Sequence, residues 1–276
     1  MVSTTLMTVV GVPIYVMKYG VSRSEWILLF FYVFATLFSI TVGYHRLFAH
    51  NTFKANAFVR FFVLFFGAAA FEQSALTWAS QHRTHHQFTD TDKDPHNIRY
   101  GFWYAHVGWI LFWKQPKFRE NVKDLEKSRL LMHQHDYYPQ WALTAGLFLP
   151  VAIGAMTGHW LGGLLLAVGA RLVLVLHSTF FINSFAHMFG TAHYDANSSA
   201  KDNWFGALLT NGEGYHNFHH RFPNDYRNGV YWYHWDPTKW LIWLLSLPGW
   251  VWDLRRTPEE TISAARREAA AALASR

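Results

Sequence analysis

The sequence predicts an all-α integral membrane protein, with four transmembrane helices in two hairpins and a cytoplasmic helical cap that holds a histidine-rich metal centre. Three observations favour this fold class. Hydrophobic residues make up 51% of the 276 residues and charged residues only 15%, against about 25% in an ordinary soluble domain. Long uncharged runs divide the chain into apolar and polar blocks. The polar blocks carry most of the 17 histidines.

The first hairpin is predicted from two uncharged runs near the N-terminus. Residues 1–17 and 26–44 carry no charged side chain, and the second run is close to the roughly 20 residues needed to cross a hydrocarbon core. The first run lacks the basic start and the small-residue cleavage site of a secretory signal, so it is expected to be retained. We therefore expect spans at about residues 4–18 and 26–44.

The second hairpin is predicted from residues 139–182, in which Arg171 is the one charged side chain. Spans are expected at about 141–157 and 160–182, with a turn at Thr157, Gly158 and His159. A charge within a span is costly and normally faces the protein interior, so Arg171 is expected either to anchor the structure or to shape the site. Residues 61–71 are too few to span, and predict an interfacial or protein-packed helix.

The basic residues predict the orientation and the cap. Two polar blocks, 45–138 and 183–276, hold 21 of the 24 Lys and Arg residues, so the positive-inside rule places these blocks and both termini in the cytoplasm. The cap is expected over residues 45–138 and 183–256. A surface helix is expected over 257–276, because Thr257 and Glu260 have capping-box spacing, with Pro258 at the first helical position. The lack of repeats and linkers favours one domain, 1–276.

Three histidine clusters are the strongest functional signal. They contain His45 and His50; His82, His85 and His86; and His216, His219 and His220. Spacings of three and four place the second and third clusters each on one helical face, whereas His50 is expected just past the helix that carries His45. His187 is added because Asn183 lies four residues before it, at the cytoplasmic end of the last span. The other histidines are expected to be ordinary packed or solvated residues.

The number of clustered histidines predicts two metal ions. One six-coordinate ion cannot use eight or nine imidazoles, and the chain has no cysteine to supply thiolates. Imidazole suits zinc, copper, iron and nickel. The HExxH helix of hydrolytic zinc sites and the Glu-x-x-His pairs of carboxylate-rich di-iron bundles are absent from the sequence. Iron is preferred, because a redox-active pair of ions at the membrane face suits oxidation of an unactivated C–H bond.

Four motifs occur in a specific order: HRLFAH at 45–50, HRTHH at 82–86, NSFAH at 183–187 and HNFHH at 216–220, the last preceded by GEGY. Supporting motifs are DPHN at 94–97 and HVGW at 106–109. This order resembles that of the membrane-bound fatty acyl desaturases of the stearoyl-CoA desaturase type. The resemblance covers about residues 26–236.

The resemblance implies a four-span fold with a cytoplasmic cap around a histidine-rich di-iron centre. It implies an oxidoreductase that uses O2 and two electrons, removes hydrogens from adjacent methylene groups of a fatty acyl chain, and leaves a cis double bond, which the sequence around His216 suggests is at Δ9. Asn183 would contact one iron through water. The implied iron ligands and catalytic residues are His45, His50, His82, His85, His86, His187, His216, His219 and His220.

An apolar tunnel is expected to hold the acyl chain beside the irons. Thr41, Leu37 and Val33 lie one, two and three helical turns before His45, so they are candidates to line or close this tunnel. Trp78 and Trp109 are candidates to line its mouth. For all five residues, ordinary packing is an alternative explanation.

The carrier of the acyl chain is left open by the sequence. Relatives that act on coenzyme A esters carry charged residues where this chain has Ser80-Gln81 and Trp113-Lys114, which leaves Lys114 as a candidate substrate contact. The loss of these charged contacts should weaken binding of the phosphorylated nucleotide of coenzyme A. Acyl-CoA is the preferred thioester, with acyl-carrier-protein and lipid-linked chains as alternatives.

The expected partners follow from charge and from missing motifs. A net charge of +6 suits anionic lipid or an acidic protein, whereas the lack of a basic run or recognition motif disfavours nucleic acid. The sequence has no cytochrome b5 domain and no flavin or nicotinamide motif, so electrons are expected from a separate ferredoxin or cytochrome b5. Alternative functions are hydroxylation, acetylenation or oxidative decarboxylation on the same scaffold, and, remotely, metal transport.

Overall fold

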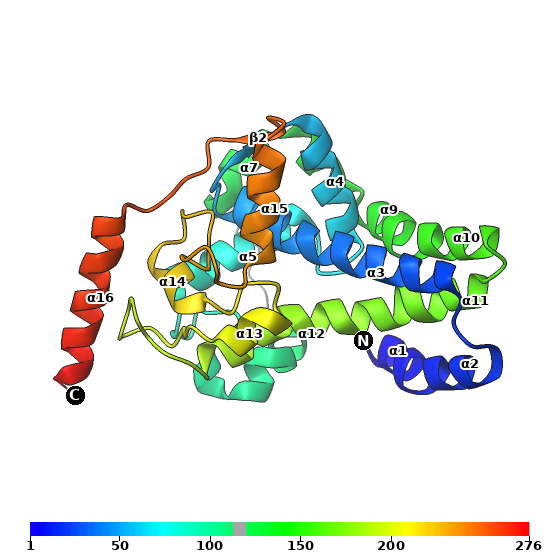
Figure 1. Ribbon diagram of the computed structural model, residues 1–276, viewed down its shortest axis with the longest axis horizontal. Helices are drawn as coiled ribbons and strands as arrows, with labels where there is room; N and C mark the ends of the chain where they lie inside the picture. The colour runs from blue at the N-terminus through cyan, green and yellow to red at the C-terminus, as the bar shows by residue number, and fades with distance from the viewer. Residues whose placement is uncertain (113–119, 276) are drawn as a thin grey trace. The chain divides into compact units, whose positions relative to one another are not determined.

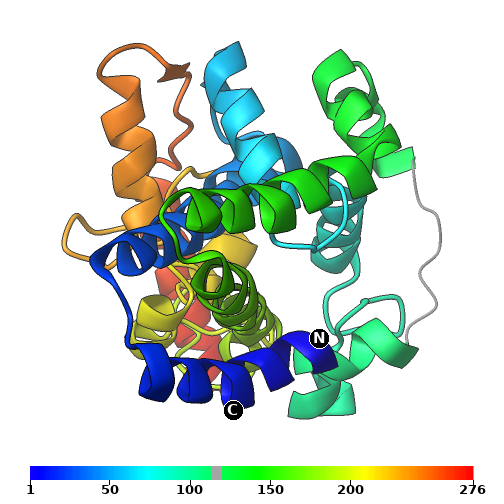
Figure 2. The ribbon, with the colours of Figure 1, turned by 90° about the vertical axis from the view of Figure 1, so that its right-hand side faces the viewer.

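Helices form almost all the regular structure of the computed structural model, which describes residues 1–112 and 120–275. Four continuous helices are long and apolar enough to cross a membrane: Val2–Tyr19, Arg23–Ala49, Tyr138–Met156 and Trp160–His187. They confirm the predicted helical membrane fold and its two hairpins. Each spanning helix contains π-helical turns as well as α-helical segments, and the label η is used here for both π-helical and 3-10-helical segments. Figures 1 and 2 show the course of these helices.

The segments of these four helices follow the chain in order. They are α1 (Val2–Leu6), η1 (Met7–Gly11) and α2 (Val12–Tyr19); α3 (Arg23–Phe38) and η2 (Ser39–Ala49); α9 (Tyr138–Leu143), η6 (Thr144–Phe148) and α10 (Leu149–Met156); and α11 (Trp160–Gly162), η7 (Gly163–Ala170), α12 (Arg171–Ser184) and η8 (Phe185–His187).

Shorter elements make up the remainder of the described chain. They are β1 (Lys54–Ala55), α4 (Ala57–Ala68), α5 (Ala75–Phe88), η3 (Ile98–Tyr100), η4 (Tyr104–Gly108), α6 (Trp109–Phe112), η5 (Glu120–Val122), α7 (Lys123–Glu126), α8 (Arg129–Asp136), α13 (Trp204–Leu209), α14 (His216–Arg221), α15 (Pro237–Ser246), β2 (Val251–Trp252) and α16 (Glu259–Ala274). The strands pair antiparallel, with Lys54 opposite Trp252 and Ala55 opposite Val251.

The chain divides into two units that alternate along the sequence. The spanning unit comprises Met1–Tyr44, Arg60–Trp78 and Asp124–His177. The cap unit comprises His45–Val59, Ala79–Lys123 and Ser178–Arg276. The expected single domain of residues 1–276 stays a prediction, and each unit is described separately below.

Helix starts and turns in the spanning unit have clear local causes. Ser22 begins α3 with a capping box, in which its side chain accepts from the Glu25 N–H and Glu25 accepts from the Ser22 N–H. Figure 2 shows the short loop that joins α2 to α3. The second hairpin turns where predicted, because Gly158 adopts a φ of 79° after α10 ends at Met156.

Close helix packing in the spanning unit depends on small residues. A Cβ on Gly154 of α10 would lie 3.0 Å from Gly163 Cα of η7. Bare backbones at this position let the two arms of the second hairpin approach closely. A buried cluster of Leu28, Tyr32 and Ala167 then joins α3 to η7.

Arg171 is buried at the centre of the spanning unit. Its Nη1 donates to the Ala69 carbonyl at 2.6 Å, its Nη2 to the Gly146 carbonyl at 2.9 Å and its Nε to the Ala167 carbonyl at 2.8 Å. The guanidinium also lies 5.6 Å from the centre of the Tyr32 ring. Arg171 therefore connects the turn after α4 with η6 and η7. Of the two roles that the sequence left open for Arg171, these contacts favour that of a structural anchor.

The cap unit has its own apolar core and a C-terminal helix docked onto it. Tyr194, Phe218, Val230 and Ile262 form a buried cluster. Helix α16, red in Figure 1, contributes Ile262 to this cluster. The helix begins at Glu259, later than predicted, and the predicted capping box is wrong: Pro258 is the N-cap and makes no side-chain hydrogen bond, while the Thr257 N–H donates to the Asp225 carboxylate at 2.8 Å.

Candidate metal centre

Four helical segments bring the clustered histidines together within the cap unit. His45 lies in η2, and His50 immediately follows the end of that helix, as predicted, with its N–H donating to the His45 carbonyl at 3.0 Å. Helix α5 carries the second cluster, η8 carries His187 and α14 carries the third cluster.

The histidine nitrogens separate into two groups, each with ligand atoms within 4.8 Å of one another. The five-histidine group contains His45, His50, His82, His86 and His219; the four-histidine group contains His85, His187, His216 and His220. The groups adjoin, because the rings of His86 and His220 stack with their centres 4.3 Å apart.

Helical spacing explains how two helices serve both groups. On α5, His82 and His86 are four residues apart and join the same group, while His85 joins the other. On α14 the assignment is reversed, since His216 and His220 join the four-histidine group and His219 joins the other. Side chains at i and i+4 lie on one stripe of a helix and i+3 lies beside it, so each helix presents imidazoles to both groups.

The distances between nitrogens fit metal coordination. His45 and His219 have their Nε2 atoms 3.0 Å apart, and His86 and His219 have theirs 2.9 Å apart. In the other group, His216 Nε2 lies 3.0 Å from both His187 Nε2 and His220 Nε2. Metal–nitrogen bonds of about 2.1 Å at right angles would place neighbouring ligand atoms roughly 3.0 Å apart. The nitrogen donors present therefore fit a pair of metal ions.

Burial keeps these imidazoles in the form that binds metal. Burial lowers the pKa of His50, His82, His86, His219 and His220 well below the usual value. It lowers the pKa of His216 to about 3. Neutral imidazole is the metal ligand, so the site is set to accept cations without first losing protons.

Hydrogen bonds to Nδ1 atoms leave the Nε2 atoms for metal. Glu213 lies 2.9 Å from His45 Nδ1 and Asp94 lies 2.8 Å from His85 Nδ1. Ser199 Oγ lies 2.7 Å from His187 Nδ1. Such partners fix the ring orientation and the tautomer of a ligand. Glu213 belongs to the GEGY sequence and Asp94 to the DPHN motif, whereas Ser199 lies in no recognisable motif.

Glu213 is held by a buried network of charges. Arg46 donates to Glu213 at 2.8 Å and to both carboxylate oxygens of Asp236, at 3.0 and 3.2 Å, while Asn228 donates to Glu213 at 2.6 Å. Burial alone would raise the pKa of Glu213, but the adjacent His45 and Arg46 outweigh burial and lower that pKa to about 2. Glu213 is therefore an ionised acceptor for the His45 ring N–H.

Two further side chains hold the ligand-bearing segments. Arg83 of α5 donates to the Phe48 and Ala49 carbonyls at the end of η2, at 2.9 and 2.8 Å. Asn217 of α14 accepts from the Tyr194 N–H at 2.7 Å and donates to the Ala200 carbonyl at 2.9 Å. These contacts fix the ends of the segments on which the first and third clusters lie.

The structure adds His96 to the surroundings of the four-histidine group. Its ring centre lies 4.3 Å from that of His85, and its Nδ1 lies 3.6 Å from Asp94. Together with His85 and Asp94, it forms a third set of potential ligands. His96 belongs to the DPHN motif, which is the available signal in the sequence, whereas a single histidine on its own is expected to be an ordinary packed residue.

The predicted substrate residues lie in different parts of the structure. Val33, Leu37, Thr41 and Trp78 belong to the spanning unit, where Thr41 is buried and the Trp78 indole N–H donates to Glu72 at 3.1 Å. Trp109 belongs to the cap unit, with its ring centre 5.3 Å from that of His96. Asn183 is a partly buried residue of α12. Lys114 lies outside the described residues.

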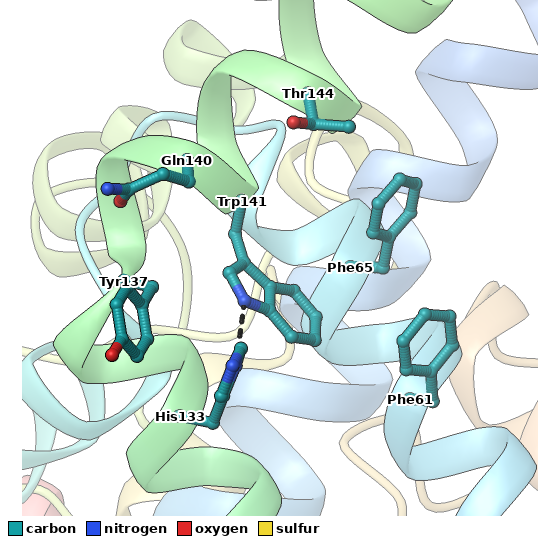
Figure 3. A pocket seen from close by; sticks show the side chains of 7 residues that line it. All are labelled: Phe61, Phe65, His133, Tyr137, Gln140, Trp141 and Thr144. Carbon is teal, nitrogen blue, oxygen red and sulfur yellow. Dashed lines mark hydrogen bonds between the residues drawn. The ribbon is translucent and has the colours of Figure 1, made fainter.

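A separate pocket of about 350 Å³ lies in the spanning unit (Figure 3). Aromatic side chains from α4, α8 and α9 line it, and the Trp141 indole N–H donates to His133 Nδ1 at 3.2 Å. Among the described residues, His133 belongs to none of the potential metal sets. This pocket is therefore distinct from the histidine groups.

The fold and the site together define a class: multi-pass membrane proteins with two adjoining groups of histidine ligands. Residues 24–253 match the family model described as fatty acid desaturase. The chain belongs to the fatty acid desaturase family.

Curated relatives agree with this membership. A probable acyl-CoA desaturase of Schizosaccharomyces pombe is 44% identical over 235 residues, covering 84% of this chain and 49% of the relative. Acyl-CoA desaturase 1 of Saccharomyces cerevisiae is 42% identical over 230 residues, covering 82% and 45%. Stearoyl-CoA desaturase of Homo sapiens is 36% identical over 246 residues, covering 87% and 68%. The chain thus spans about half the length of the two yeast relatives.

Proposed function

We propose that the protein is an oxygen-dependent fatty acyl desaturase that introduces a cis double bond, at Δ9, into a long-chain acyl thioester. The observation that carries this proposal is the division of nine buried imidazoles into two adjoining groups. Two nitrogen-ligated irons would supply the redox chemistry with O2 that an unactivated C–H bond requires. In the balanced reaction, the acyl chain loses two hydrogens, and these combine with O2, two electrons and two protons to give two waters.

The histidines are proposed to hold one iron in each group. His45, His50, His82, His86 and His219 would bind the first, and His85, His187, His216 and His220 the second. The second group has one fewer nitrogen, and Asn183 is proposed to contact its iron through water. The ligand chemistry alone leaves copper, zinc and nickel as alternatives, and the names of the relatives favour a redox metal.

The protein's contribution to the chemistry is positioning. An unactivated methylene pair has no polar handle, so an apolar wall must fix which carbons lie beside the metal ions. We propose Val33, Leu37 and Thr41 as residues that line or close the acyl tunnel, and Trp78, Trp109 and Lys114 as contacts nearer the carrier. Two buried carboxylates, Glu213 and Asp94, would fix the orientation of the His45 and His85 rings beside the acyl chain.

Acyl-CoA is the proposed thioester, because the relatives are named for it. Ser80 stands where CoA-type relatives carry charge, and here its hydroxyl is buried and bonds Asn121 at 2.8 Å. An acyl-carrier-protein or lipid-linked chain is therefore the alternative substrate. The basic polar blocks favour a cytoplasmic cap with cytoplasmic termini and a separate acidic electron donor, of ferredoxin or cytochrome b5 type.

One experiment tests the function and the carrier together. Full-length protein is reconstituted in liposomes with iron, a reducing system and stearoyl-CoA, stearoyl-acyl-carrier-protein or phosphatidylcholine, and products are analysed by mass spectrometry. We expect a Δ9 cis double bond in the CoA ester. A hydroxylated or acetylenic product would contradict desaturation, and metal flux without acyl oxidation would favour transport.

A further inference from the structure

We propose that electrons reach the metal centre along a series of aromatic rings from exposed Trp232 to buried Tyr215, and that the basic pocket beside Trp232 docks an acidic one-electron carrier protein. This inference rests on the proposed redox function and deepens it by naming the place where the carrier binds. All the residues involved belong to the cap unit.

The ring series begins at the surface. The side chain of Trp232 is 84% exposed and that of Tyr233 is 60% exposed. Their ring centres lie 5.7 Å apart, and the Tyr233 and His234 ring centres lie 5.1 Å apart. Trp235, one residue beyond His234, is also 44% exposed, and adjacent exposed aromatic side chains of this kind suit a docking contact.

The ring series ends next to a proposed ligand. His234 stacks on Tyr215 with ring centres 4.4 Å apart and planes 7° apart. Tyr215 is only 8% exposed and is bonded through the backbone to His216, whose Nε2 lies 3.0 Å from two other histidines of its group. Each step from Trp232 to His216 is thus a ring contact or a peptide link.

The backbone leaves room for this stack. A Cβ added to Gly229 would lie 2.7 Å from His234 Cβ and 3.2 Å from the Tyr215 ring. Among the described atoms, His234 Nδ1 is buried without a hydrogen-bond partner. Hydrogen bonding from this ring nitrogen therefore does not explain the position of His234, whereas the stack with Tyr215 does.

The surface around Trp232 is basic. A pocket of about 210 Å³ is lined by Trp232, Trp240, Arg227, Lys239 and Arg256, among other residues. Arg227 is paired with Asp225, and Lys239 is buried near the Asp236 carboxylate, whereas Arg256 is exposed and donates to the neutral Tyr226 hydroxyl. Exposed indoles beside the Arg256 guanidinium fit a partner with acidic residues around an apolar contact.

Delocalised rings in contact couple electronically better than alkyl side chains do, which gives the series a function beyond packing. Each carrier would lose one electron and the metal centre would gain it, with the aromatic residues unchanged overall. Two docking events supply the two electrons needed for each double bond.

The route is tested by photochemical injection of electrons. Because the chain has no cysteine, Trp232→Cys gives one attachment point for a ruthenium photosensitiser on the full-length, iron-loaded protein. Iron reduction after a flash is followed by absorbance, in samples first matched for iron content. We expect a fast phase that Tyr215→Leu and His234→Leu each remove, and that Tyr194→Leu retains. Tyr194 is the matched control, because it is also buried and packs against α14 through Phe218.

The docking surface is tested separately, with metal-free protein and the soluble haem domain of a cytochrome b5 as the probe. Arg256→Glu should raise the Kd roughly fivefold to tenfold, since it replaces an attraction by a repulsion. Arg267→Glu makes the same charge change at an exposed position of α16 and should leave the Kd unchanged.

Two results would overturn the proposal. A fast phase that survives both Tyr215→Leu and His234→Leu would exclude the ring series, and equal effects of Arg256→Glu and Arg267→Glu would exclude the pocket. Neither measurement uses an acyl substrate, so failure of the proposed desaturation would leave both results interpretable.

Discussion

At the scale of single residues, His45, His85 and His187 are oriented by what holds their other ring nitrogen. His85 is the clearest case, because its Nδ1 lies 2.8 Å from Asp94 while its Nε2 lies 3.3 Å from His220 Nε2. The Nδ1 contact fixes the ring, and the other nitrogen faces the group.

We expect His85→Ala to abolish desaturation and to lower the iron content of a protein that still folds. The substitution removes one of four nitrogens from its group. Activity on stearoyl-CoA, bound iron and thermal unfolding are measured in parallel with His193→Ala, which alters an exposed histidine. Wild-type turnover in His85→Ala would count against the ligand assignment.

Glu213→Gln tests the buried charge network that holds the His45 ring. The substitution removes the negative charge that holds the His45 ring N–H and pairs with Arg46. Loss of such a partner typically costs about 10- to 100-fold in metal affinity, and we expect a loss of this size in an iron-binding titration. Glu268→Gln, which alters an exposed ion pair with Arg221, is the control; equal affinity in both variants would contradict the network's role.

The sequence predicted which histidines gather in the structure better than it predicted the residues that hold them. The clustered histidines have helical spacing, so their shared helix faces are readable from local sequence. Ser199 and Asn228 act across the fold on His187 and Glu213, and no local spacing connects them. The position of His96 beside His85 could not be read from the sequence either, because a single histidine carries little information without its neighbours in space.

At the scale of elements, the spanning helices could be predicted because long uncharged runs have few other interpretations. The start of helix α16 was harder to predict. The spacing of Thr257 and Glu260 suggested a capping box, but Asp225, 32 residues away in sequence, binds the Thr257 N–H instead. Tertiary contacts of this kind override local capping signals.

Arg171→Met is expected to destabilise the spanning unit by roughly 2–4 kcal/mol, because it leaves buried carbonyls of three segments without their donor. Thermal unfolding of detergent-solubilised protein measures this effect. Arg129→Met, at an exposed position of α8, makes the same change without buried contacts. Equal unfolding temperatures for the two variants would contradict the anchoring role.

At the scale of the whole molecule, the buried histidines link stability to pH. Their pKa values are lowered by burial in the folded protein, so below a pH of about 6.5 the unfolded chain binds protons that the folded chain does not. The Tm of metal-free protein should therefore fall as pH decreases from about 7.5 to 5, whereas bound iron should delay the fall by excluding protons. A Tm independent of pH in metal-free protein would contradict the burial of neutral imidazoles.

The central claim is that distant parts of the chain gather nitrogen ligands around two oxygen-activating ions. The most direct test is elemental analysis of the purified full chain, combined with X-ray absorption at the metal edge. We predict about two irons per chain, each with mainly nitrogen ligands. One zinc per chain, or iron bound mainly by carboxylate oxygen, would contradict the account.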